Sequence, residues 1–158
     1  MTAVTNVSKR ELASFGSLSR ATVVKPDLHR ILLVEDDEGH ALLLRLTLAE
    51  VAPRASLELI LDGERALTRL KESASGHRPD LMILDLKLPR LDGHELLAEV
   101  KSDPKLQSLP VLVVTTSTKQ TDAELASVYS RVAFLNKPVP PVELRRAIEG
   151  LGFALQAG

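Results

Sequence analysis

Polar residues follow apolar runs of the sequence at the points where buried strands would end. They are Glu35 and Asp36, Asp85, Thr115 and Lys137. Because the carboxyl ends of parallel strands share one edge of a sheet, these side chains are expected to meet there. Carboxylates held together need a cation, and their hard oxygen atoms suit Mg²⁺. A lysine and a hydroxyl group beside them can contact phosphoryl oxygens. The residue types therefore indicate phosphoryl transfer onto a carboxylate.

The stretch around Asp85 has the clearest local pattern. Leu81–Leu84 is an unbroken apolar run of the length of a strand buried on both faces, and Asp85 ends it. Pro89 then stops the extended structure, and Asp92 with Glu95 has the spacing of a capping box that opens a helix. A lone aspartate after a strand is usually a cap. The other polar residues at strand ends are what give Asp85 a chemical role.

The alternation of apolar strand and amphipathic helix repeats along the chain. The expected strands cover residues 31–34, 57–61, 81–84, 110–114 and 132–135. The expected helices cover residues 41–51, 64–70, 93–102, 121–129 and 141–151, the fourth with Thr121 and Glu124 as a capping box. Short connections between these elements predict one α/β domain, in which helices cover both faces of a parallel sheet.

The acidic run Glu35–Glu38 has a second interpretation. Acids before a helix also stabilise its N-terminus through the helix dipole, by a few tenths to about 1 kcal/mol per charge. The helix that follows carries two apolar stripes on nearly opposite sides, Leu42/Leu46/Ala49 and Leu44/Leu48/Val51. One core face requires only one stripe, so the other lacks an obvious burial partner.

Composition excludes several classes of function. The chain has 158 residues, 44% of them hydrophobic and 26% charged, which is typical of a soluble globular domain. A formal net charge of −1 gives no global attraction to nucleic acid or to an anionic membrane. Cysteine is absent, which fits a reducing compartment, and no apolar run approaches the roughly 20 residues of a spanning helix. We therefore expect a cytoplasmic protein with no nucleic-acid and no membrane partner.

The domain boundaries follow from where the periodicity begins and ends. Residues 1–28 are rich in serine and threonine and are expected to form a flexible N-terminal extension, in which Ser8 and Glu11 have the spacing to cap one short helix. Residues 29–152 are expected to form the folded domain, and residues 153–158 a C-terminal tail. No DNA-binding or enzyme domain is expected after residue 150.

The segments ILLVEDD, LMILDLKLPRLDG, VLVVTTS and FLNKP resemble, in residue, order and spacing, the receiver domain of two-component response regulators. The resemblance covers residues 30 to about 150. It implies a flavodoxin-like fold with five parallel strands in the order 2-1-3-4-5. The leucine-rich first helix is most similar to that of stand-alone receivers paired with bacterial phytochrome kinases.

The resemblance also implies roles for the acidic residues. Asp85 is implied to be the phosphoacceptor. Mg²⁺ is implied to bind Glu35, Asp36, Asp85 and the backbone carbonyl of Lys87.

Further implied roles concern the phosphoryl group and the switch. Thr115 and Lys137 are implied to contact the phosphoryl oxygens, and Thr115 with Phe134 to form the switch. The peptide bond between Lys137 and Pro138 is implied to be cis. Lys87 and Ser117 occupy positions that vary widely in the family and are thought to tune the lifetime of the phosphoryl group.

The implied function is that of a single-domain response regulator, a phosphoacceptor without enzymatic activity beyond its own phosphotransfer and autodephosphorylation. Its implied donor is the phosphohistidine of a sensor histidine kinase. A phosphohydrolase that also forms an aspartyl phosphate is the enzyme alternative, but it resembles Asp-x-Asp, and here Lys87 stands at the second position. An adaptor independent of phosphorylation is the third interpretation. Such a scaffold would have no reason to keep acids unpaired at a buried edge.

A homodimer is expected through the surface of the fourth helix, the fifth strand and the fifth helix. This surface combines apolar with charged residues, namely Leu125, Val128, Tyr129, Lys119, Glu124, Arg145 and Arg146. The first helix, with its unpartnered leucine stripe, is the competing surface. The four histidines, His29, His40, His77 and His94, lie far apart in the sequence and are given no role.

Overall fold

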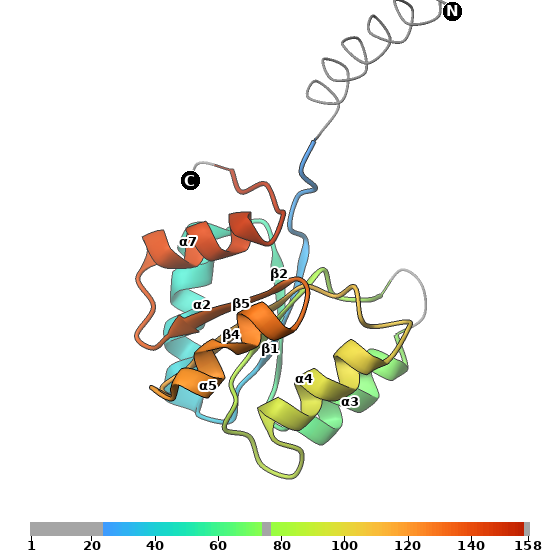
Figure 1. Ribbon diagram of the computed structural model, residues 1–158. Coiled ribbons are helices and arrows are strands. Elements are labelled where there is room, and N and C mark those ends of the chain that lie inside the picture. Colours follow the sequence, from blue (N-terminus) through green and yellow to red (C-terminus); the bar gives the residue numbers. More distant parts are fainter. Residues whose placement is uncertain (1–23, 74–76, 157–158) are drawn as a thin grey trace, which may run out of the picture.

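The computed structural model describes residues 24–73 and 77–156. Its centre is a parallel five-stranded sheet in the order β2-β1-β3-β4-β5 (Figure 1). The strands are β1 (Arg30–Val34), β2 (Ser56–Ile60), β3 (Leu81–Leu84), β4 (Val111–Thr115) and β5 (Val132–Asn136). The predicted fold class and strand order are therefore confirmed.

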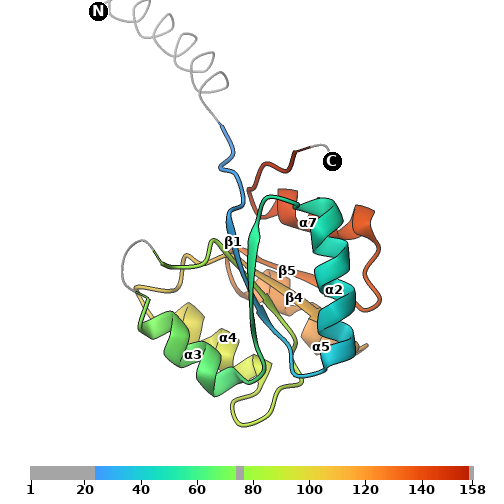
Figure 2. The same cartoon turned by 180° about the vertical axis from the view of Figure 1, so that it is seen from behind.

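Helices cover both faces of the sheet, as Figures 1 and 2 show. They are α2 (Glu38–Val51), α3 (Gly63–Lys71), α4 (Gly93–Ser102), α5 (Gln120–Ala123), α6 (Leu125–Val128) and α7 (Pro141–Gly150). Helices α2 and α7 pack on one face, and α3 and α4 pack on the other. None of the described helices is both long and apolar enough to cross a membrane.

Alternation of side chains along the strands divides the core into two layers. In β1, Ile31 and Leu33 join the layer beneath α2 and α7, whereas Leu32 and Val34 join the layer beneath α3 and α4. The central strand β3 is buried along its whole length. A strand with helices on both sides needs apolar residues at every position, and this explains the unbroken run Leu81–Leu84.

The register of the sheet aligns the strand ends. Val34 pairs with Leu84, and Leu84 pairs with Val113. The backbone amide of Asp85 donates to the carbonyl of Val34 at 3.0 Å. The residues that follow β1 and β3 are thereby fixed side by side at one edge.

The prediction of one helix over residues 121–129 is wrong. The chain instead forms α5 and α6, of four residues each, and Tyr129 already has an extended backbone. Because α5 begins at Gln120, Thr121 lies inside its first turn and cannot be its cap. Lys119 precedes the helix without a side-chain cap. The capping box of Thr121 and Glu124 is therefore wrong.

The segments before β1 and after α7 contact each other. Asp27 forms an isolated bridge with Ala154, and the amide of Ala154 donates to the carbonyl of Pro26 at 2.9 Å. Phe153 is buried in the layer beneath α2 and α7. The boundaries expected at residues 28 and 152 stay a prediction. The short helix expected near Ser8 lies outside the described residues.

Candidate functional site

A lysine joins two buried carboxylates at the carboxyl edge of the sheet. The Nζ atom of Lys137 lies 2.6 Å from Oε1 of Glu35 and 3.0 Å from Oδ2 of Asp85. Both acids are buried: Glu35 directly follows β1 and Asp85 directly follows β3. A single ammonium group thus shares its charge between two carboxyl groups that strand pairing holds together.

The two carboxyl groups have opposite pKa shifts. Burial raises the pKa of Glu35 from 4.5 to about 8. Burial also acts to raise the pKa of Asp85, but hydrogen bonds with Glu35 and Lys137, and the charge of Lys137, hold it below its usual value. The opposite shifts favour the proton on Glu35 and the negative charge on Asp85. An ionised carboxylate is the form that can act as a nucleophile.

Asp36 occupies a different environment from its neighbour Glu35. It is exposed at the surface, beyond the end of β1. Among residues 24–73 and 77–156, the ligand atoms that lie within 4.8 Å of one another come from Glu35, His40 and Asp85, and Asp36 is not among them. The structure thus brings together Glu35, Asp85 and Lys137, and leaves Asp36 at the rim of the site.

One oxygen of Glu35 is relevant to whether the site could bind a metal ion. Its Oε2 atom is buried and accepts no hydrogen bond from any described residue. A buried oxygen without a partner is unfavourable, and a cation with oxygen ligands would satisfy it. The donor set of carboxylate oxygens is therefore chemically suited to a hard divalent ion.

His40 belongs to the site, although its isolated position in the sequence gave it no role. Its Nδ1 atom lies 3.1 Å from Oε1 of Glu35 and 3.0 Å from Nζ of Lys137. Asp37 caps α2 by accepting from the amide of His40 at 2.9 Å, which places His40 in the first turn. Side chains of a first turn tilt back toward the strand end. The cap at Asp37 was the signal that could have located it.

Asp85 and Thr115 are held by the loops that follow their strands. Oδ1 of Asp85 accepts from the amide of Lys87 at 3.2 Å. Thr115 is buried, and its Oγ1 accepts from the amide of Ser117 at 3.3 Å. The side chain of Lys87 reaches Oγ1 of Thr116 at 3.3 Å, joining the two loops.

Phe134 lies on β5, and the cis peptide bond follows directly after this strand. Phe134 is half-buried against the layer beneath α3 and α4, and it pairs with Val113 across the sheet. The Lys137–Pro138 peptide bond is cis, so that prediction is confirmed. The amide of Lys137 donates to the carbonyl of Thr115 at 2.9 Å, which fixes the lysine beside β4.

The helix after the Asp85 loop rests directly on that loop. At Gly93, the first residue of α4, a Cβ atom would lie 2.4 Å from the carbonyl oxygen of Asp85. Glycine is therefore required by the close approach of the two backbones. Asp92 caps the helix by accepting from the amide of Glu95 at 2.9 Å, as its spacing predicted.

A groove opens beside the buried lysine. It has a volume of about 310 Å³ and runs between α2 and the segment that follows β5. Its lining residues are His40, Leu43, Leu44, Thr47, Thr116, Lys137, Pro138 and Val139. A small group in this groove would reach the edge of the sheet without crossing the core.

The family model of the response regulator receiver domain matches residues 31–149. The chain belongs to this family. Its place in two-component signalling follows from that membership, and receiver domains bind a divalent metal ion.

Similar proteins include phytochrome response regulators. Response regulator Rcp1 of Synechocystis sp. is 35% identical over 125 residues, which cover 77% of this chain and 84% of Rcp1. The probable methanogenesis regulatory protein FilR2 of Methanothrix harundinacea is 36% identical over 138 residues, covering 86% of this chain and 89% of FilR2.

Solved structures of receiver domains agree with this one. The bacteriophytochrome response regulator AtBRR has a TM-score of 0.71 at 32% identity, covering 84% of this chain and all of that one. The Mn²⁺-bound form of Rcp1 has a TM-score of 0.62 at 32% identity, covering 78% of this chain and 91% of that one. The receiver domain described here is thus homologous to phytochrome response regulators.

Proposed function

We propose that this receiver domain accepts a phosphoryl group on Asp85 from the phosphohistidine of a sensor histidine kinase. The observation that carries the proposal is the placement of Asp85, a buried carboxylate at the edge of the sheet whose Oδ2 atom lies beside Nζ of Lys137. Lys137 stabilises its negative charge from 3.0 Å. The groove lined by His40 and Lys137 opens beside this lysine.

In the proposed reaction, an oxygen of Asp85 attacks the phosphorus atom and the phosphorus–nitrogen bond of the donor breaks. The donor imidazole leaves with the electron pair of that bond. Lys137 and the hydroxyl of Thr115 are the groups proposed to contact the phosphoryl oxygens, where negative charge increases.

We propose Mg²⁺ as the metal ion. Glu35, Asp36, Asp85 and the carbonyl of Lys87 would hold it, and the unpartnered Oε2 of Glu35 supports this set. When bound, a divalent ion neutralises charge on the phosphoryl oxygens. Glu35 must lose its proton to act as a ligand, so binding is expected to release a proton.

The alternatives are less well supported by the side chains. A phosphohydrolase of the Asp-x-Asp kind needs a second acid, and the residue at that position, Lys87, extends toward Thr116 instead. An adaptor independent of phosphorylation would not need an ionised aspartate at a buried edge. The protein would therefore act as a phosphoacceptor, without further enzymatic activity.

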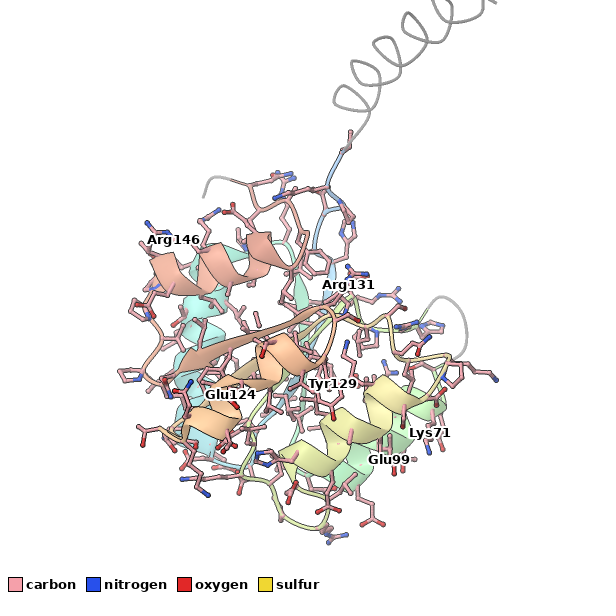
Figure 3. The ribbon with its side chains drawn as sticks, in the orientation of Figure 1. Lys71, Glu99, Glu124, Tyr129, Arg131 and Arg146 are labelled. Carbon is pink, nitrogen blue, oxygen red and sulfur yellow. The ribbon has the colours of Figure 1, made fainter. Side chains whose placement is uncertain are left out.

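The proposed partner is a kinase of the phytochrome type, and phosphoryl transfer would take place in the cytoplasm. The proposed output is a change around Thr115 and Phe134 that alters a surface for a second copy of the chain. That surface is formed by α5, α6, β5 and α7. Figure 3 shows Glu124 and Tyr129 beside the short helices and Arg146 on α7. Val128 is 68% exposed there and supplies an apolar centre.

Incubation with acetyl phosphate and Mg²⁺, followed by intact mass measurement, tests the proposal. One phosphoryl group should be added to the wild type and none to Asp85→Asn. Asp27→Asn is the matched control, because Asp27 is exposed and lies outside the site. Equal labelling of Asp85→Asn and the wild type would overturn the assignment.

A further inference from the structure

A second cluster of polar side chains lies next to the phosphoryl site without belonging to it. Nε2 of His94 lies 2.7 Å from Oδ1 of Asp122, and the hydroxyl of Ser117 donates to Oδ2 of the same carboxylate. The three residues come from α4, from α5 and from the loop between β4 and α5. A single carboxylate thus joins three parts of the chain.

The cluster holds the loop that carries Thr115. The amide of Ser117 donates to Oγ1 of Thr115 at 3.3 Å, and the carbonyl of Ser117 accepts from Nδ2 of Asn136 at 2.5 Å. Ser117 is therefore fixed through its amide, its carbonyl and its hydroxyl. The loop cannot move relative to β4 and α4 without breaking at least one of these bonds.

The other end of the cluster is fixed to the loop of Asp85. His94 is the second residue of α4, and Gly93 before it lies against the backbone of Asp85 and Leu86. The amide of Gly93 donates to the carbonyl of Leu86 at 2.9 Å. The His94–Asp122 contact therefore links the loop of the proposed acceptor to the loop of the proposed switch residue.

The carboxylate at the centre of the cluster, Asp122, is buried and hydrogen-bonded on both oxygens. Asp122 is only 6% exposed. Its hydrogen bonds with Ser117 and His94 hold the pKa of Asp122 below its usual value. Hydrogen bonds to an ionised acceptor are stronger than neutral ones, and a buried carboxylate without them would be strongly disfavoured. Among the described residues, the titratable groups that face it are His94 and Lys119.

We propose that His94 and Asp122 are positioning residues that hold the Thr115–Ser117 loop in its resting conformation. This rests on the proposed function, because the loop matters only if Thr115 responds to a phosphoryl group on Asp85. Phosphorylation then has to displace the loop against these bonds. The strength of the cluster sets how much of the population is in the active conformation.

Hydrogen exchange of the Ser117 amide in the unphosphorylated protein measures directly how firmly the cluster fixes the loop. Asp122→Ala is expected to speed this exchange by at least about tenfold, the effect of losing one charge-assisted hydrogen bond. Affinity for the phosphoryl analogue beryllofluoride, measured with Mg²⁺, should rise in the same variant, since less of the binding energy is used to displace the loop.

Conservative variants separate positioning from general loss of structure. His94→Gln retains a side-chain nitrogen that can donate to Asp122 and should exchange like the wild type, whereas His94→Leu should resemble Asp122→Ala. Glu99→Ala, an exposed change on the same helix as His94, is the matched control and should alter neither quantity.

Unchanged Ser117 exchange in both Asp122→Ala and His94→Leu would overturn the proposal, and so would weaker beryllofluoride binding in a folded Asp122→Ala. The exchange result does not depend on phosphorylation. If Asp85 takes no phosphoryl group but the exchange rates respond as expected, the proposed function fails while the hold on the loop stands.

Discussion

At the scale of single residues, the site contains two similar carboxyl groups whose pKa values shift in opposite directions. Glu35 and Asp85 share Lys137, yet the pKa of Glu35 is raised to about 8 whereas the pKa of Asp85 is lowered. Glu35 is fully buried, and one of its oxygens has no hydrogen-bond partner among the described residues. Asp85 additionally accepts from the amide of Lys87. Because both acids follow buried strands, local hydrogen bonding is what would make Asp85, the proposed acceptor, the nucleophile.

Stability should depend on pH through Glu35. Its pKa in the folded protein is about 8, against 4.5 ordinarily, so between these values the folded state binds a proton that the unfolded state does not. The free energy of unfolding should consequently fall as pH rises from about 4.5 to about 8. Urea unfolding with a chelator present, at several pH values in this range, measures the slope.

Glu35→Gln cannot ionise and is the direct comparison for that measurement. The variant should lack the part of the slope that Glu35 contributes, so its advantage over the wild type should grow toward pH 8. Parallel pH profiles for the two proteins would show that Glu35 is already ionised in the fold.

At the scale of elements, α4 and the loop of Asp85 approach each other closely at Gly93. Gly93 leaves no room for a side chain, since a Cβ atom would lie 2.4 Å from the carbonyl oxygen of Asp85 and also 2.4 Å from Cα of Leu86. Backbone atoms on both sides cannot yield as a flexible side chain would. Any change here should move the acceptor loop.

Gly93→Ala is expected to destabilise the protein by about 1–3 kcal/mol, the usual effect of overpacking, and to slow labelling of Asp85. Gly150→Ala is the matched control, because nothing lies within 4 Å of the corresponding Cβ position at the end of α7. Thermal unfolding of both variants gives the comparison. Equal stability of the two would show that α4 adjusts freely.

How far the sequence predicts an element depends on the range of the interactions that form it. Leu81–Leu84 was predicted correctly because burial on both faces leaves an unbroken apolar run. The break between α5 and α6 was not predicted, since it accompanies contacts of Asp122 with Ser117 and with the distant His94. His40 was missed for a related reason: its partner Lys137 is 97 positions away.

At the scale of the whole molecule, the strand order determines which residues can meet. Placing β1 beside β3 brings Glu35 to Asp85, and placing β5 beside β4 brings Lys137 to the same edge. Exposed apolar residues then mark two outer surfaces, Val128 on α6 and the leucines 42, 43 and 46 on α2. Leu42 and Leu46 belong to one of the two apolar stripes read from the sequence of this helix, and the other stripe, Leu44/Leu48/Val51, is the buried one.

The proposed dimer can be assigned to one of these surfaces with two exposed substitutions. Val128→Asp should dissociate the phosphorylated dimer by placing a charge at its apolar centre, whereas Leu42→Asp should leave it intact. Light scattering at matched concentrations gives the mass. Dissociation by Leu42→Asp alone, or a wild type that is monomeric in both phosphorylation states, would show the proposed surface to be wrong.

The most direct test of the central claim is to locate the phosphoryl group in the full-length protein. The wild type is labelled with acetyl phosphate and Mg²⁺, and tandem mass spectrometry then identifies the modified residue. The group should be found on Asp85, with its amount reduced when Mg²⁺ is chelated. A phosphoryl group on His40 or any other residue, with none on Asp85, would contradict the account.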